Sequence, residues 1–191
     1  MSPQPSNRAQ LIEGTLRCLE RLPPERITAR AIAAESGANL ASITYHFGAK
    51  DTLVTEAVIE GLDRWLEEVG ARLRGIAPDT PPARFRRAGD AIEDTRRHHI
   101  GLARNFLGAL ARAQHDARVR ALLAAGFHRT RDSMADLLGM GADEAGHDAA
   151  GLVLALFNGL LFQALLDPAL AIEGDRMLKA QTRLTRVLSD R

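Results

Sequence analysis

Apolar residues recur every three to four positions along most of the chain, a spacing that is typical of helices with one buried face. The first such segment predicts a helix over residues 8–21. Asn7 and Gln10 form a candidate capping box at its start, where each side chain would bond a free backbone N–H group. The pair Pro23–Pro24 ends the helix, because proline interrupts helical hydrogen bonding.

Longer segments with the same spacing occupy most of the remaining chain. They cover residues 51–74, 80–99, 102–110, 119–138, 152–166 and 177–188. Nowhere do apolar and polar residues alternate as they do in a half-buried strand. The pattern therefore predicts an all-α fold of about nine helices.

Two short helices are expected between the first helix and the long segment that begins at Asp51. Thr28 is a good N-cap for a helix through Glu35, and Gly37 can adopt the left-handed conformation that ends such a helix. A second short helix, over residues 39–46, is expected to carry its apolar residues on a buried side. These apolar residues are Leu40, Ile43 and Phe47. Two short helices joined by a tight glycine turn form a helix-turn-helix.

Composition narrows the class of protein. Of 191 residues, 46% are hydrophobic, which is enough for a folded core, and only 4% are aromatic. The 25 basic and 24 acidic side chains exclude a polybasic coating protein but allow a local DNA-binding patch. No charged start precedes an apolar run, and the longest apolar run, residues 151–166, contains Asn158 and Gln163. We therefore expect a soluble cytoplasmic protein without a membrane partner.

Enzymatic motifs are absent from the sequence. The six histidines form no metal-binding pair with a nearby acid, and there is neither a phosphate-binding glycine loop nor a nucleophile elbow. Cys18 lies in the first helix without a local base and is interpreted as a core residue. We expect no catalytic residues, no cofactor and no metal.

One segment of the sequence, residues 28–53, contains the clearest functional motif. It reads Thr28-x3-Ile32-Ala33-x2-Ser36-Gly37-x6-Thr44-Tyr45-His46-Phe47-x2-Lys50-Asp51-x-Leu53, and it resembles the DNA-binding module of the tetracycline-repressor-type (TetR-type) regulators of bacteria. The resemblance implies an N-terminal helix-turn-helix DNA-binding domain over residues 1–50, with its motif at 28–47. It also implies a helical bundle for ligand binding and dimerisation over residues 51–191. The chain departs from the family pattern at Ala38, Ala41 and Thr44, where the family usually has an aliphatic, a glycine and an aromatic residue.

The side chains of this stretch suit contact with DNA. Small outward residues let a helix enter the major groove, hydroxyl and amide groups can bond base edges, and Tyr45 and Lys50 can reach phosphates. Thr28 stands at a helix N-terminus, where a phosphate is favoured. The predicted DNA-binding residues are Thr28, Ala38, Asn39, Ala41, Ser42, Thr44, Tyr45, His46 and Lys50. With six basic and four acidic side chains in residues 1–50, a moderate salt dependence is expected.

A set of aromatic and polar residues in the second part is a candidate lining for an effector pocket. These residues are Trp65, His98, Arg104, Phe106, Phe127, Asn158 and Phe162. Arg104 is the sharpest candidate, because a cation within an apolar segment can pair with an acidic ligand. The alternative is that the aromatics fill the core and that His98–His99 ends a helix.

The run over residues 151–166 is too apolar on all sides to be the surface helix of a monomer. It is buried centrally or packs against a second chain. The family resemblance implies that it forms a four-helix interface with the last helix in a two-fold dimer. The candidate interface residues are Leu152, Leu156, Leu160, Gln163, Leu184 and Leu188.

These observations favour a homodimeric, ligand-responsive transcriptional repressor that binds a palindromic operator. The expected partners are double-stranded DNA, a second copy of the chain and an unidentified small molecule. The alternative is a helical protein-interaction or small-ligand-binding protein without sequence-specific DNA binding.

Overall fold

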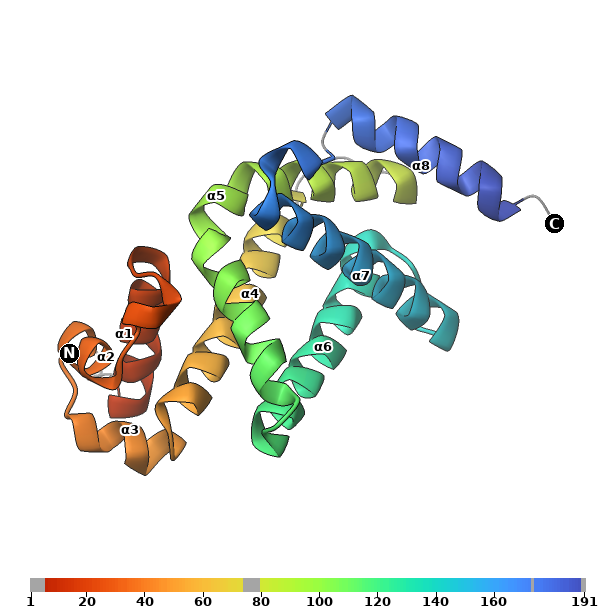
Figure 1. Cartoon of the computed structure of the whole chain (residues 1–191). Helices are drawn as coiled ribbons and strands as arrows, with labels where there is room; N and C mark the ends of the chain where they lie inside the picture. The colour runs from red at the N-terminus through yellow and green to blue at the C-terminus, as the bar shows by residue number, and fades with distance from the viewer. Residues whose placement is uncertain (1–5, 74–79, 173, 190–191) are drawn as a thin grey trace. The chain divides into compact units, whose positions relative to one another are not determined.

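The computed structural model describes residues 6–73, 80–172 and 174–189, with the side chains of residues 81, 82, 97, 175, 188 and 189 outside the description. Within these ranges the ordered elements are all helices, so the predicted all-α fold is confirmed (Figure 1). They are α1 (Asn7–Arg21), the 3-10 helix η1 (Pro24–Arg26), α2 (Ala29–Ser36), α3 (Leu40–Phe47), α4 (Lys50–Leu73), α5 (Pro81–Ala113), α6 (Ala117–Leu138), α7 (Glu144–Leu166), the 3-10 helix η2 (Pro168–Leu170) and α8 (Gly174–Ser189).

The chain divides into two compact units. Unit 1 comprises Met1–Glu67 and His98–Thr130, and unit 2 comprises Glu68–Arg97 and Arg131–Arg191. Helices α4, α5 and α6 each contribute one part to unit 1 and the other part to unit 2. The boundary predicted at residue 50 is a functional one, between DNA binding and regulation. It differs in kind from the two compact units and stays a prediction.

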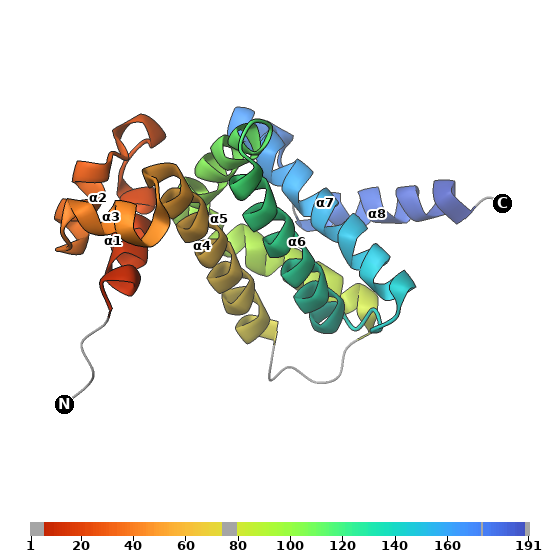
Figure 2. The ribbon, with the colours of Figure 1, turned by 90° about the horizontal axis from the view of Figure 1, so that it is seen from below.

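Helices α1, α2 and α3 lie together in unit 1, as both ribbon views show (Figures 1 and 2). Close packing of α1 depends on glycines. A Cβ built on Gly14 would lie 2.5 Å from the Ser36 Cβ, and one on Gly101 of α5 would lie 2.0 Å from the Leu19 carbonyl oxygen. Only glycine permits these approaches of helix to helix. The buried core around them contains large side chains, including Leu11, Leu19, Ile32, Phe47 and Leu53.

Local signals place the ends of the first helices. The Thr28 hydroxyl accepts a hydrogen bond from the Ala31 N–H group at 3.1 Å, and Gly37 has a φ of +67°. Both expectations for α2 are therefore confirmed. The capping box at Asn7 is wrong, because Ser6 caps α1 by accepting from the Ala9 N–H group at 3.3 Å. A serine hydroxyl one residue earlier reaches the N–H group three positions on.

Helix α5 is continuous through His98 and His99, so the interpretation of this pair as a helix end is wrong. No proline follows the pair before Ala113, and the residues on either side keep the helical spacing. The Thr95 hydroxyl donates to the Ala91 carbonyl one turn earlier, at 2.7 Å, so this polar side chain is satisfied within the helix. The segments expected at 80–99 and 102–110 are therefore one helix.

Unit 2 is built from the end of α4, the first part of α5, the second part of α6, α7, η2 and α8. Phe85 of α5 stacks on Phe157 of α7 with 5.5 Å between the ring centroids. The Arg131 side chain of α6 lies against Gly151 of α7. Most buried apolar residues of the described part of this unit are alanines, namely Ala88, Ala91, Ala135, Ala150, Ala164 and Ala171. Its core is therefore thin compared with that of unit 1.

Candidate nucleic-acid interface and ligand cavity

Helix α3 presents a small-residue face to solvent. Ala41 and Thr44 are exposed, and the Tyr45 side chain is 84% exposed. On the opposite side Ile43 and Phe47 are buried as predicted. Leu40, expected among the buried residues, is 45% exposed, so that expectation is wrong. Its position on the first turn of a short helix leaves it beyond the edge of the core.

Two N-caps expose polar groups at the starts of α2 and α3. The Asn39 Oδ1 atom accepts from the Ala41 N–H group at 2.9 Å, which leaves the Asn39 amide nitrogen to donate elsewhere. Thr28 caps α2 and is exposed. Both caps therefore stand where a helix dipole favours an anion, which supports contact with phosphates.

The remaining predicted DNA-binding residues are less exposed. Ala38, Ser42 and His46 are half-buried. The His46 ring lies edge-on to Tyr45, with 4.8 Å between the centroids, and to Phe47, with 6.3 Å. This packing orients the His46 and Tyr45 rings on the surface of α3.

Lys50 has a structural partner in the free protein. Its ammonium group donates to the Ile27 carbonyl at 3.4 Å and forms an ion pair with Asp51 at 3.0 Å. It therefore ties the start of α4 to the segment before α2. A phosphate contact by Lys50 would compete with these interactions.

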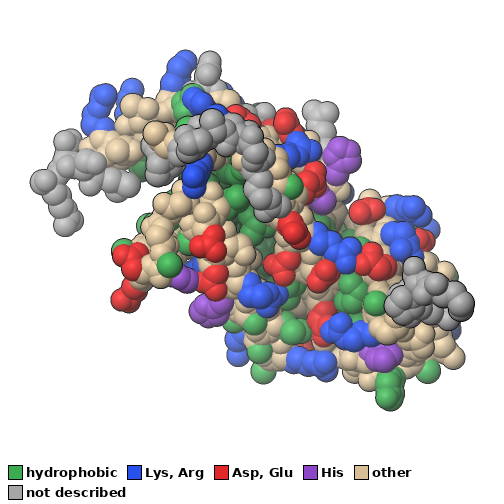
Figure 3. All heavy atoms as spheres, turned by 180° about the vertical axis from the view of Figure 1, so that it is seen from behind, with side chains coloured by type: hydrophobic (Ala, Val, Ile, Leu, Met, Phe, Trp, Pro, Cys, Tyr) green, Lys and Arg blue, Asp and Glu red, His purple; other side chains and the backbone are tan. Residues whose placement is uncertain are grey.

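Most of the other cations near the motif are also paired. Arg17 and Arg21 both contact Glu35, at 2.7 and 3.6 Å, and Arg8 pairs with Glu56. On the face drawn in Figure 3, acidic and basic side chains of the protein are interspersed. Pairing of this kind weakens the local positive potential.

Arg26 and Arg30 are candidates that sequence reasoning missed. Both are exposed, both flank Thr28 at the start of α2, and neither has an ion-pair partner in the described part of the chain. Their proximity in sequence to the cap was the signal that could have identified them. They can supply positive charge for phosphate binding.

A charged cavity of about 430 Å³ in unit 1 lies among α1, α4 and α6. Ion pairs cross it. Arg64 of α4 contacts both Glu13 of α1 and Glu60, and Arg129 of α6 contacts Asp63 at 3.2 Å. The hydrogen bond from the Arg64 guanidinium lowers the pKa of the Glu13 carboxyl below its ordinary value. The cavity is best understood as the site of helix-to-helix ion pairing.

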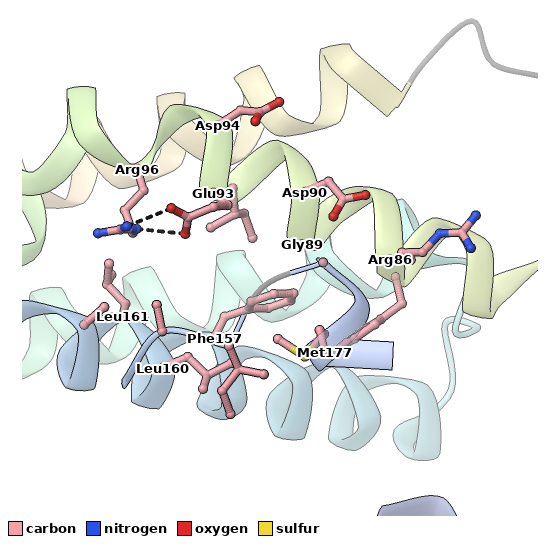
Figure 4. Close-up of a pocket in the computed structure, with 16 residues that line it drawn as sticks. Arg86, Gly89, Asp90, Glu93, Asp94, Arg96, Phe157, Leu160, Leu161 and Met177 are labelled. Carbon is pink, nitrogen blue, oxygen red and sulfur yellow. Dashed lines mark hydrogen bonds and ion pairs between the residues drawn. The ribbon is translucent and has the colours of Figure 1, made fainter. Parts of the chain in front are cut away.

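A second cavity, of about 450 Å³, lies within unit 2 between α5, α7 and the start of α8 (Figure 4). Figure 4 shows Phe157 pointing from α7 toward α5, with Met177 beside it. The other lining residues are Phe85, Arg86, Gly89, Asp90, Ile92, Glu93, Asp94, Arg96, Leu160, Leu161, Ala164, Ala171, Ile172 and Gly174. A mostly apolar lining with a few polar groups is typical of small-molecule sites.

The charges around this cavity are nearly balanced. Arg96 and Glu93 form a two-bond ion pair at 2.7 and 2.8 Å, and the Arg96 side chain is only 14% exposed. Asp94 lies 3.8 Å from Arg72. In Figure 4, Asp90 and Asp94 point away from α7. The Glu93–Arg96 pair therefore adds a largely neutralised polar group to the lining.

The predicted effector residues lie elsewhere. Trp65 stacks on His99 with 5.0 Å between centroids, and Phe106 packs on Phe127 at 5.8 Å, within unit 1. His98 and Arg104 are exposed, and Asn158 and Phe162 are half-buried on α7. The cavity of unit 2 is lined by none of these residues. Its lining comes from α5 and α7 positions that the sequence alone does not bring together.

Helix α7 exposes one apolar face. Leu152, Leu156 and Leu166 are 75%, 37% and 85% exposed, and nothing lies within 4 Å of a Cβ built on Gly159. Gln163 is exposed on this face, whereas Leu160 lines the cavity. On α8, Leu184 and Val187 are 51% and 67% exposed, and the side chain of Leu188 lies outside the described residues. By length and composition α7 also meets the criteria for a membrane span.

Comparison with known proteins places this geometry in a family. Residues 11–57, which include the whole helix-turn-helix, match the family model of bacterial regulatory proteins of the tetR family. The transcriptional regulator BetI of Burkholderia thailandensis is 27% identical over 160 residues, which cover 83% of this chain and 82% of BetI.

Solved structures with a similar fold include other transcriptional regulators. A chain assigned as a transcriptional regulator from Pseudomonas aeruginosa is 26% identical, with a TM-score of 0.62 over 85% of this chain and 80% of its own. A second, from Saccharomonospora viridis in complex with choline, shares the fold at 22% identity, with a TM-score of 0.59 over 84% and 85%. Because the relatives are regulators, the expectation that the chain is not an enzyme holds. Residues 11–57 therefore carry the DNA-binding domain of the tetR family of bacterial regulatory proteins, and the chain is a DNA-binding transcriptional regulator.

Proposed function

We propose that the protein is a cytoplasmic, homodimeric repressor that binds a palindromic operator through α3 and releases it when a small molecule binds. The observation that carries the proposal is the exposed face of α3, where Ala41, Thr44 and Tyr45 stand clear of the core. The narrow part of this face fits into a major groove, and the caps at Thr28 and Asn39 suit flanking phosphates.

The apolar face of α7 supports a second copy as the partner of this helix. Two recognition helices must lie about 34–36 Å apart to enter successive major grooves, and a two-fold dimer provides that arrangement. Leu152 and Leu166, left in water, are candidates for burial in such an interface, as are Leu156, Gln163 and Leu184. Gly159, which has no side chain and an open space beside its Cα, leaves room for a close approach of two helices.

A membrane span is a poorer explanation of α7. A helix in lipid needs apolar residues around its whole circumference, whereas one side of α7 already packs within unit 2 through Phe157 and Ala164. The exposed side is a stripe that includes the polar residue Gln163. A protein interface accepts such a side chain more readily than a bilayer does.

The cavity of unit 2 is our candidate effector site. Its two phenyl rings, Phe85 and Phe157, favour a ligand with an apolar or cationic face toward them. The neighbour that contains choline supports a quaternary ammonium compound as the first probe. The effector would weaken operator binding by its difference in affinity for the DNA-bound and DNA-free states. The effector residues that the sequence predicts, which include Arg104, do not line this cavity. They remain proposals for a separate effector site.

Selection of bound duplexes from a random pool tests the DNA-binding part of the proposal. We expect the wild-type chain to enrich a palindromic sequence at low salt, and Tyr45→Ala to lose it. Tyr45 is 84% exposed, so the variant should keep its fold, and Leu107→Ala on α5, at a residue 40% exposed, is the matched control. Absence of enrichment at low salt would contradict the proposal and favour a helical interaction protein.

Choline binding tests the effector site. Calorimetric titration of choline into the wild-type chain and into Phe157→Ala should give a lower affinity for the variant. Leu165→Ala, on the same helix but outside the cavity lining, is the control. Equal affinities in all three proteins would place the ligand elsewhere.

A further inference from the structure

Leu40 is the unusual residue of α3. Sequence spacing predicts it to be buried, yet its side chain is 45% exposed on a helix whose other apolar residues, Ile43 and Phe47, are 3% and 0% exposed. It follows directly after the cap Asn39, on the first turn of the helix. Burial of an exposed apolar side chain against an apolar partner is favourable, so Leu40 can contribute to binding at this place.

The position of Leu40 on the helix limits what that partner can be. With 3.6 residues per turn, residues i, i+1, i+4 and i+5 share one side of a helix, so Leu40 shares its side with Ala41, Thr44 and Tyr45. All four are exposed. In a helix-turn-helix the N-terminal residues of the second helix contact base edges. Leu40 therefore stands at the base-reading end of α3, while Tyr45 stands about 1.4 turns further on.

The chemistry of the major groove supplies one apolar group. Leucine neither donates nor accepts hydrogen bonds, and the polar edges of the four bases offer it no attractive partner. The 5-methyl group of thymine is the apolar feature in this groove. We infer that Leu40 reads a thymine by contact with its methyl group and so is a specificity-determining residue of each half-site.

This inference rests on the proposed function, since it assumes that α3 enters the major groove. It adds a direct chemical requirement to that proposal: one thymine per half-site whose methyl group matters more than its hydrogen-bonding edge. Ala41, the exposed neighbour of Leu40, has a much smaller side chain and reaches less far from the helix.

Replacement of thymine by deoxyuridine removes the methyl group and leaves the hydrogen-bonding edge intact. The consensus duplex enriched by the wild-type chain is resynthesised with deoxyuridine at each thymine in turn, changed symmetrically in both half-sites. Titration by fluorescence anisotropy should find one position at which wild-type binding weakens by about fourfold per half-site, or about fifteenfold for two, as burial of one methyl group predicts. Leu40→Ala should bind both duplexes equally.

Two controls make the result specific. Leu107→Ala removes an exposed leucine from α5 and should keep the full sensitivity to deoxyuridine. A second pool selection with Leu40→Ala should return a consensus without thymine preference at that position, with the rest of the half-site retained. The variant should keep its fold, because Leu40 is nearly half exposed, and thermal unfolding checks this.

The outcomes separate the inference from the function that it rests on. If every deoxyuridine duplex binds the wild-type chain as the thymine duplex does, or if Leu40→Ala keeps the same sensitivity, the thymine contact is wrong although α3 still reads DNA. If the wild-type pool shows no enrichment, the proposed function is contradicted and the inference falls with it.

Discussion

The two units differ in the apolar side chains that they leave in water. In unit 1 the exposed large apolar residues are Leu40 and Tyr45 of α3 and Leu107 of α5. In unit 2 they are Leu152, Leu156, Leu166, Leu170, Leu184 and Val187, all on or beside α7 and α8. Unit 1 exposes side chains chiefly on the helix that we assign to DNA, and unit 2 exposes an apolar face that we assign to a second copy.

Core composition explains the difference. Unit 1 buries leucine, isoleucine and phenylalanine around α1, whereas the buried apolar residues of unit 2 are mostly alanines. An alanine removes little apolar area from water, so a core made of alanines contributes less to stability. Unit 2 therefore gains more from the proposed interface, and its stability should depend on dimerisation.

The strongest test of this contrast is Leu152→Glu on α7. Burial of a leucine contributes about 1.5–3 kcal/mol, and a two-fold dimer loses it twice, so the free energy of dimerisation should fall by about 3–6 kcal/mol. Sedimentation velocity should detect monomers where the wild-type chain is dimeric. Leu107→Glu is the control and should leave the mass unchanged. A variant that sediments like the wild type would remove α7 from the interface.

Tyr45→Phe tests unit 1 by removing one hydroxyl group. A hydrogen bond to a charged group contributes about 1.5 kcal/mol or more, so two chains on one operator should lose about 3 kcal/mol, or about a hundredfold in affinity. Anisotropy titration on the selected duplex measures the loss. The mass in solution should not change, because Tyr45 lies on α3. Unchanged affinity would mean that its hydroxyl contacts no phosphate.

Gly101→Ala tests the packing of unit 1. The added Cβ would lie 2.0 Å from the Leu19 carbonyl oxygen, so α1 and α5 must separate. We expect a loss of about 2 kcal/mol in the free energy of unfolding, within the range of overpacked cores. Gly108→Ala on the same helix, where the nearest atom is the flexible Arg112 Nη1 at 3.5 Å, should be neutral or stabilising. Urea unfolding compares the two, and equal losses would contradict the close approach.

Glu13→Gln should have the smallest effect. The Glu13 pKa is lower in the folded protein than in the unfolded chain, because Arg64 bonds the carboxylate. Its contribution to stability is therefore present above the ordinary glutamate pKa and is lost as the pH falls through the folded value. Both side chains are about half exposed, so the contribution stays below about 1 kcal/mol. Unfolding as a function of pH should show a shallower acid-side loss for the variant, and an unchanged slope would contradict the assignment.

Sequence patterns predicted the local features of the fold. Thr28 and Gly37 act through their own neighbours in the chain, so residue type and spacing sufficed to place α2. Leu40 was misplaced, because periodicity gives the face of a helix but not where the core ends. The sequence also placed the cap of α1 at Asn7 rather than at Ser6, because both of these adjacent polar residues can cap a helix.

The candidate ligand cavity could not be predicted in the same way. Its lining joins residues near 85–96 with residues near 157–177, and this pairing is set by tertiary packing rather than by local spacing. Trp65 and Phe106 were reasonable aromatic candidates, but the structure uses them in ring contacts with His99 and Phe127. The sequence allowed α7 to be either a core helix or an interface helix, because composition does not show which side chains are buried.

We propose that α3 reads one half-site and that α3 of a second copy, held by α7, reads the other. Anisotropy titration of the wild-type chain against the selected palindrome, and against a duplex with one half-site scrambled, tests both parts at once. We predict that scrambling one half-site lowers the affinity by at least a hundredfold, because each mismatched base pair costs about 1–3 kcal/mol. Equal affinity for the two duplexes would contradict the claim.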